Sequence, residues 1–313
     1  ALSSGIAYER CILFPDKDYF IVADRLEGSE PWAYRDLFRP SSLSIVPTAD
    51  KNGDGAYTEG EVGHVKGNLS VGDTPYDWLS LPYKSEASPG VNTSLVTWAT
   101  GNPYGKAVEL RIYTVPASEV RLEKYVSRVG GYNAQNEVFS PVVTFRTGPQ
   151  KSLYRATVLL SRYADEAPRA PSTLAVNGSG NAMKVDAGGH VDYVYTGAGR
   201  SSFDLFSTDA AVLFVRDEGR PVEYTLVNGT FVDYRGTPLI KAPGSLAYLT
   251  LRQGGNGTSI VLRADKAMPL EVYAPAASSV TVDGAPSGKV TANENGLVFI
   301  DLKAGEHAVE IKN

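Results

Sequence analysis

The stretch Tyr224-Thr225-Leu226-Val227-Asn228-Gly229-Thr230-Phe231-Val232-Asp233-Tyr234 gives the strongest local indication of the fold class. Its two arms, residues 224–227 and 231–234, are rich in aromatic and β-branched residues, which favour strands. Asn-Gly between two such runs is the strongest short-range signal for a β-hairpin. We therefore predict two antiparallel strands joined by a tight turn at Asn228-Gly229.

Short runs of the same kind recur along the whole chain, separated by Gly, Pro, Asn and Asp. They include residues 19–22, 95–98, 108–113, 156–160, 191–195, 248–251 and 260–262. No amphipathic helical pattern lies between them. Many short strands with regular turns and no intervening helices predict an all-β fold built as a large antiparallel β-sandwich.

A domain boundary is expected near Ala264-Asp265. Residues 1–264 form the predicted sandwich, and residues 265–313 form a small C-terminal β unit with a turn at Asp283-Gly284. A unit of this size buries too little apolar surface to be stable by itself. We therefore expect it to dock on the larger sandwich.

Composition excludes several classes of function. The chain has 313 residues, a net charge of −5 and a pI of about 5.4, with no basic cluster. Nucleic-acid binding is therefore not expected. A single cysteine excludes an intramolecular disulfide. No membrane span or signal peptide is apparent, and the start at Ala1 is typical of a mature or trimmed product.

Residues 50–61 match the twelve-position calcium loop, in which oxygen ligands alternate around a glycine at position six. The predicted calcium ligands are Asp50, Asn52, Asp54, the Ala56 carbonyl, Thr58 and Glu61. Pro47 and the strand-like run before it argue against the incoming helix of an EF-hand. We expect a calcium loop inserted between strands, where the ion stiffens the loop. The alternative is a polar turn without an ion.

Five Asn-X-Ser/Thr sequons indicate a glycosylated protein that is extracellular or at the cell surface. The acceptor residues are Asn68, Asn92, Asn177, Asn228 and Asn256. We expect these residues to face solvent.

The sequence offers aromatic residues for sugar contact but no evident catalytic cluster. Tyr76 and Trp78 alternate with acidic residues in a predicted loop, where they either stack on a sugar or anchor the loop on the sandwich. The three histidines, His64, His190 and His307, are far apart in sequence, so zinc-ligand spacing is absent. We expect each histidine to be structural.

Several segments, in order, resemble the β-sandwich half of the heparinase II/III-like polysaccharide lyases. They are residues 8–28, 154–160, 189–195 and 203–216, and the stretch from Gly229-Thr230 onward. Asp24 matches the aspartate of the family's Val-x-Asp strand. The resemblance implies a cleft for acidic polysaccharide between the sandwich and a helical toroid, and cleavage by β-elimination with Tyr and His as acid and base.

Two departures from that family change the expected function. The sequence contains no toroid, and residues 32–39 lack the histidines that the family often has there. Tyr34, Arg35 and Arg39 remain as candidates to contact a sugar carboxylate. We predict a secreted, structural or glycan-contacting β-module without catalysis of its own.

Two alternatives to this function stay open. One is the β-half of a lyase that cleaves uronate-containing glycans, and the other is a subunit of an extracellular filament or surface layer. The predicted partner is a polysaccharide or cell-surface glycan. Self-association or a separate helical domain would supply further contacts.

Overall fold

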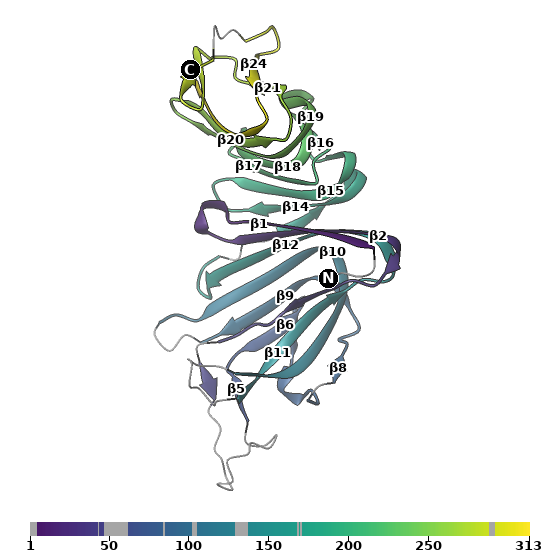
Figure 1. The fold of residues 1–313 in the computed structure, drawn as a ribbon. Coiled ribbons are helices and arrows are strands. Elements are labelled where there is room, and N and C mark those ends of the chain that lie inside the picture. The colour runs from purple at the N-terminus through teal and green to yellow at the C-terminus, as the bar shows by residue number, and fades with distance from the viewer. Residues whose placement is uncertain are drawn as a thin grey trace.

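The structure is a computed structural model that describes residues 5–42, 44–46, 62–83, 85–101, 105–128, 137–167, 169, 171–287 and 292–313. Within these ranges the chain is nearly all strand, with two short 3-10 helices, η1 (Pro15–Lys17) and η2 (Trp78–Ser80). The strands form two large sheets whose ladders are almost all antiparallel. The all-β prediction is confirmed. Figure 1 shows an elongated molecule in which most strands run across the long axis.

The first sheet contains 12 of the described strands, in the main order β1-β2-β12-β10-β11-β5-β4. Their bounds are β1 (Ile6–Leu13), β2 (Phe20–Trp32), β3 (Arg35–Phe38), β4 (Ile45–Val46), β5 (Gly63–Val65), β6 (Asn68–Val71), β7 (Thr74–Tyr76), β8 (Glu86–Ala87), β9 (Asn92–Thr100), β10 (Val108–Arg128), β11 (Glu137–Arg146) and β12 (Gln150–Tyr163).

Strand β10 connects two parts of this first sheet. Its first half pairs with β9 and β12, and its second half pairs with β11 and β8. The register with β9 shifts between Tyr113 and Ser118, around Pro116, which cannot donate a ladder hydrogen bond. One hydrophobic core includes residues from both parts, among them Trp98, Ile112, Leu122 and Phe145.

The second sheet contains 13 of the described strands, in the main order β13-β14-β15-β16-β18-β19-β20-β25-β22-β23. Their bounds are β13 (Pro171–Leu174), β14 (Val176–Asp186), β15 (Val191–Phe203), β16 (Phe206–Thr208), β17 (Val212–Asp217), β18 (Pro221–Tyr234), β19 (Thr237–Gly254), β20 (Gly257–Ala264), β21 (Met268–Tyr273), β22 (Ser279–Val282), β23 (Ala285–Pro286), β24 (Leu297–Leu302) and β25 (Gly305–Lys312).

The C-terminal residues continue this second sheet across the boundary expected at Ala264-Asp265. Strand β20 pairs with β25 over its full length, and β21 pairs with both β19 and β24. Leu262 before the boundary and Ile300 after it belong to one hydrophobic core. The last strands therefore share their core with the strands before them.

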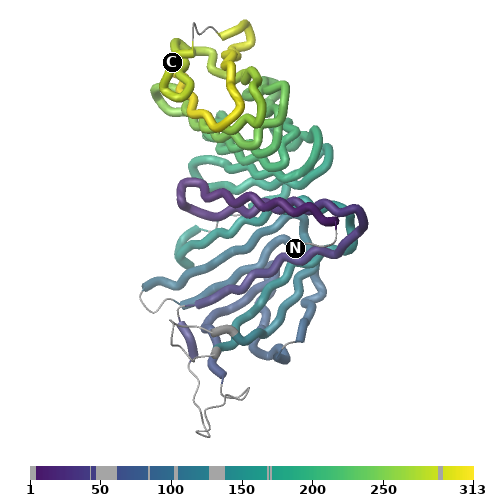
Figure 2. Tube along the Cα trace, in the orientation of Figure 1, coloured from purple at the N-terminus to yellow at the C-terminus, as the bar shows by residue number. Residues whose placement is uncertain are grey.

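The two sheets pack on each other through a smaller apolar cluster. Ile21 of β2 and Val158 of β12 lie on one side, and Val194 of β15 and Phe214 of β17 lie on the other. Figure 2 shows the N-terminal β1–β2 hairpin, in purple, lying across the middle of the molecule where the sheets meet. This placement leaves the other face of β1 and β2 available for a site.

The predicted hairpin at Asn228-Gly229 is wrong, because both residues lie inside the single strand β18. Asn228 has a φ of 50°, and the register with β19 shifts just beyond Gly229, so the pair forms a bulge. A Cβ on Gly229 would lie 2.8 Å from the Cα of Ala210. The two-residue hairpin turn lies instead at Arg235-Gly236, where Tyr234 pairs with Thr237.

Candidate functional site

A pocket on the first sheet, with a volume of about 390 Å³, contains two of the residues predicted for glycan contact, Tyr34 and Arg35. Its lining residues come from β1, β2, β3 and the turn before β3: Ile6, Tyr8, Arg10, Leu26, Ala33, Tyr34, Arg35 and Asp36. Tyr34 and Arg35 were expected from the sequence. The structure adds Tyr8, Arg10 and Asp36 to them.

Strand alternation places the polar residues of β1 and β2 on one face. Side chains two apart in a strand share a face, so Tyr8 and Arg10 point to the same side. Their antiparallel partners are Leu26 and Asp24, which alternate in the same way on β2. Ala23, opposite Cys11, lies on the other face of β2 together with Ile21, and Ile21 packs against the second sheet. The pocket therefore lies on the face of the first sheet that points away from the second sheet.

Asp24 holds both β1 side chains in place. The Arg10 guanidinium donates from Nε to Oδ1 at 2.6 Å and from Nη2 to Oδ2 at 2.8 Å, and the Tyr8 hydroxyl donates to Oδ1 at 3.0 Å. Burial and the negative Asp24 carboxylate raise the pKa of Tyr8 to about 12. The hydrogen bond to Asp24 raises the pKa of Arg10. At neutral pH the tyrosine is neutral and the arginine is charged.

A fully buried arginine, Arg155 of β12, supports the floor of the pocket. Its Nη1 donates to Oδ2 of Asp36, and its Nη2 donates to the Ser118 hydroxyl at 2.7 Å. Asp36 Oδ1 also lies 4.0 Å from Nη2 of Arg10. The side chains of Arg155, Asp36, Arg10 and Asp24 thus form a row of alternating charge in which Arg10 is the most exposed. Each ion in the row is stabilised by its neighbours.

Tyr34 and Arg35 contribute differently to the pocket. Tyr34 is buried, its hydroxyl donates to the Lys151 carbonyl at 3.3 Å, and burial raises its pKa. Arg35 has a half-exposed side chain, and its Nη1 donates to Oε1 of Glu86 at 3.3 Å. Tyr34 therefore acts as a fixed wall, whereas Arg35 presents its charge to solvent.

The remaining residues predicted for glycan contact lie outside this pocket. Arg39 lies over the ring of Tyr125, 4.9 Å from its centroid. Tyr76 and Trp78 line a different pocket of about 400 Å³ beside β6. Trp78 is only 2% exposed and packs edge-on against Trp98, so it anchors the segment on the core. Trp78 is therefore not part of the candidate site.

None of the three histidines lines the pocket between β1 and β3. His64 lies beside Trp78, and burial lowers its pKa. His190 Nε2 is 3.5 Å from Oδ2 of Asp192. His307 Nδ1 is 2.8 Å from Oδ2 of Asp283, and this hydrogen bond raises the pKa of His307.

All five sequon asparagines are exposed: Asn68, Asn92, Asn177, Asn228 and Asn256. The Asn228 side-chain amide donates to Glu9 Oε1 at 2.7 Å, so it also bridges the two sheets. The other four lie in the exposed positions that sugar attachment requires.

The predicted calcium ligands Asp50, Asn52, Asp54, Ala56, Thr58 and Glu61 lie outside the described residues. The calcium loop therefore stays a prediction. Within the described ranges, no group of three or more His, Cys, Asp or Glu residues could hold a metal. Those ranges also contain no helix with the length and apolar character needed to cross a membrane.

Comparison with known proteins leaves the resemblance to the lyases as a prediction. No protein-family model matches the chain, and no curated protein matches it.

Proposed function

We propose that this chain is an extracellular β-module that binds acidic polysaccharide in the pocket between β1 and β3, without catalysis of its own. The observation that carries the proposal is the pair of half-exposed guanidinium groups, Arg10 and Arg35, on one pocket beside the Tyr8 ring. Arginine recognises carboxylates through paired hydrogen bonds. The five exposed sequons support an extracellular location.

The geometry leaves donors free for a ligand. Arg10 uses Nε and Nη2 for Asp24, and its Nη1 donates to none of the described residues. The Tyr8 ring is 45% exposed and lies 5.6 Å from the Arg10 guanidinium. A uronate residue would place its carboxylate at Nη1 and an apolar ring face on Tyr8.

The same residues favour binding over β-elimination. Elimination needs a base near the proton α to the carboxylate and an acid at the leaving oxygen. Tyr8 has a pKa of about 12, far above the value suited to a base at neutral pH. No histidine lines the pocket to take that role.

A second candidate function is the β-half of a two-part lyase, in which a helical partner supplies the missing groups. It is favoured by an exposed apolar surface that continues the pocket along β1. This surface consists of Ile12, Phe14 and Phe20, each more than 40% exposed, with the two phenylalanine rings stacked at 4.1 Å. Ile12 lies on the same face as Arg10, so a partner seated there would cover the pocket mouth.

Arg35→Gln is expected to weaken binding of uronate oligosaccharides about tenfold, because one charge-assisted hydrogen bond is lost. Titration calorimetry with alginate or heparan oligosaccharides measures the change. Neutral dextran serves as the ligand control and should not bind.

Arg39→Gln is the matched protein control, since Arg39 lies on Tyr125 outside the pocket. Equal binding by both variants, or no binding by the unaltered protein, would remove the proposed function. Ultraviolet absorbance recorded in parallel detects the unsaturated product of elimination. Sustained growth of that signal would establish the lyase instead.

Calcium removal is expected to lower the melting temperature, since an ion bound only by the folded chain stabilises it by mass action. The stabilisation is about 2.7 kcal/mol when free calcium is about a hundredfold above its dissociation constant. Glu61→Gln should abolish the difference between calcium and chelator, and Asp73→Asn, outside the loop, should preserve it. Identical melting curves with and without chelator, with no calcium by elemental analysis, would contradict the loop.

A further inference from the structure

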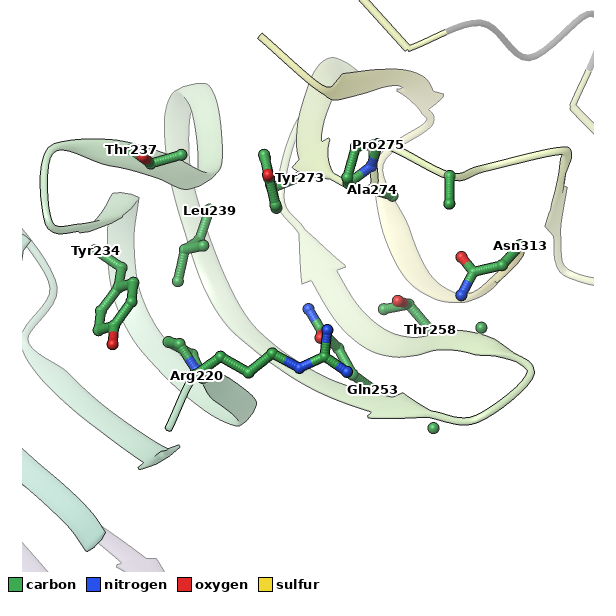
Figure 3. Close-up of a pocket in the computed structure, with 14 residues that line it drawn as sticks. Arg220, Tyr234, Thr237, Leu239, Gln253, Thr258, Tyr273, Ala274, Pro275 and Asn313 are labelled. Atoms are coloured by element: carbon green, nitrogen blue, oxygen red, sulfur yellow. The ribbon is translucent and has the colours of Figure 1, made fainter. Parts of the chain in front are cut away.

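A second pocket lies near the C-terminal end of the second sheet and shares no residue with the pocket between β1 and β3. It has a volume of about 420 Å³, within the range of small-molecule sites. Figure 3 shows its lining: Arg220, Pro221, Tyr234, Thr237, Leu239, Gln253, Gly254, Gly257, Thr258, Tyr273, Ala274, Pro275, Ala276 and Asn313.

Bending of the β18–β19 ribbon builds this pocket. Pro221 and Tyr234 are the first and last residues of β18, yet both line the same space. The bulge at Asn228-Gly229 lies between them, and in the next step of the ladder Thr230 alone is opposite residues 242–245 of β19. Bulges bend a strand and increase its twist. The Tyr234 hydroxyl, which donates to Oδ2 of Asp217 at 3.3 Å, confirms that β18 ends near the last residue of β17.

Three polar side chains of the pocket, those of Arg220, Gln253 and Asn313, lack partners within the described part of the chain. Arg220 is exposed and makes no ion pair there, and the side-chain amides of Gln253 and Asn313 make no hydrogen bond. Arg220 is also the only charged side chain among the described lining residues. The pocket therefore offers one cation and two amides to a ligand.

Apolar groups complete the lining. Figure 3 shows Tyr234 and Leu239 on one side of the pocket, Thr258 and Asn313 on the opposite side, and Tyr273 between them. Tyrosine rings supply flat apolar surface with a polar edge. A ligand that fits must combine an apolar ring face with hydroxyls and one negative group.

We propose that this pocket binds a single sugar acid, with its carboxylate on Arg220 and its hydroxyls on Gln253 and Asn313. A neutral sugar would leave the guanidinium without a charged partner. A purely apolar ligand would bury the two amides without hydrogen bonds, which is costly. The ligand is either a free sugar acid or the terminal residue of an acidic chain, and both present the same groups.

Titration calorimetry with glucuronate tests the site, with glucose as the neutral counterpart. Saturable binding of glucuronate is expected, with Arg220→Gln weakening it about tenfold through loss of a charge-assisted contact. Arg263→Gln is the matched control, because Arg263 is an exposed arginine of the same sheet that pairs with Asp265. A glucuronate oligomer that binds more tightly than the monomer in the Arg35→Gln variant, with an affinity that Arg220→Gln lowers, would identify a chain end as the source.

The result that overturns the proposal is equal affinity for glucose and glucuronate, absence of binding, or an Arg220→Gln variant that binds as the unaltered protein does. The Arg35→Gln variant separates this site from the proposed function, since glucuronate binding at the second pocket persists in it. Arg220 is exposed, so its replacement leaves the fold intact, and circular dichroism checks this.

Discussion

Arg155→Met is expected to lower the free energy of unfolding by about 3–5 kcal/mol, the usual cost of breaking a buried ion pair on one side. The Arg155 side chain is completely buried. Its guanidinium donates hydrogen bonds to Asp36, to the Ser118 hydroxyl and to the Phe145 carbonyl. Methionine fills much of the space but leaves the Asp36 carboxylate without its nearest cation. Urea denaturation followed by tryptophan fluorescence measures the loss.

Arg35→Met provides the comparison within the same pocket. Its pair with Glu86 is half exposed, so we expect a change within about 1 kcal/mol. If Arg155→Met left the free energy of unfolding unchanged, Asp36 would have turned out to solvent. The alternating charges below the pocket would then not stabilise the fold. We also expect Arg155→Met to weaken uronate binding, because Asp36, which loses its partner, lines the pocket.

Asp192→Ala is the second substitution with a large expected effect, again about 3–5 kcal/mol. Asp192 is fully buried on β15, and it accepts two hydrogen bonds from Arg216, at 2.9 and 3.0 Å. It also accepts one from the hydroxyl of Tyr19, in the loop before β2, at 2.5 Å. Removal of the carboxylate deprives the buried Arg216 guanidinium of its buried ion-pair partner and leaves the ion pair with the exposed Asp16.

Tyr19→Phe is the matched control for the contact between the sheets. It deletes only the hydroxyl, so its cost should be smaller, about 1.5–3 kcal/mol for a hydrogen bond to a charged group. Thermal unfolding of both variants shows which substitution lowers the stability more. A larger cost for Tyr19→Phe than for Asp192→Ala would mean that the carboxylate is not the centre of this network.

The fold class followed from local composition, but the position of the turns did not. Val, Ile, Tyr and Thr runs predicted strands correctly because these residues suit a pleated, half-buried surface. Asn228-Gly229 was misassigned because a left-handed residue followed by glycine suits a bulge as well as a turn. The actual turn at Arg235-Gly236 places an arginine at a φ of 51°, a position for which the sequence offers no signal. Asp283-Gly284, in contrast, forms the predicted turn between β22 and β23.

The candidate site could be predicted only where its residues are adjacent in sequence. Tyr34 and Arg35 were identified because they stand together in one stretch. Arg10 and Arg155 were not, because they approach Asp36 from two strands that meet only through β2. The signal that could have placed Arg10 in the pocket is its alternation with Tyr8 on one strand, opposite Asp24 on the next.

Strand β1 pairs with β2 alone among the described strands, so it forms an edge of the first sheet. Edge segments open locally at a lower free energy than the whole fold unfolds, and their amide hydrogens exchange sooner. Because β1 carries Tyr8 and Arg10, local opening of this strand dismantles the pocket while the rest of the sheet stays folded. Ligand binding and the opening of this strand are therefore linked equilibria, and bound ligand is expected to slow amide exchange along residues 6–13.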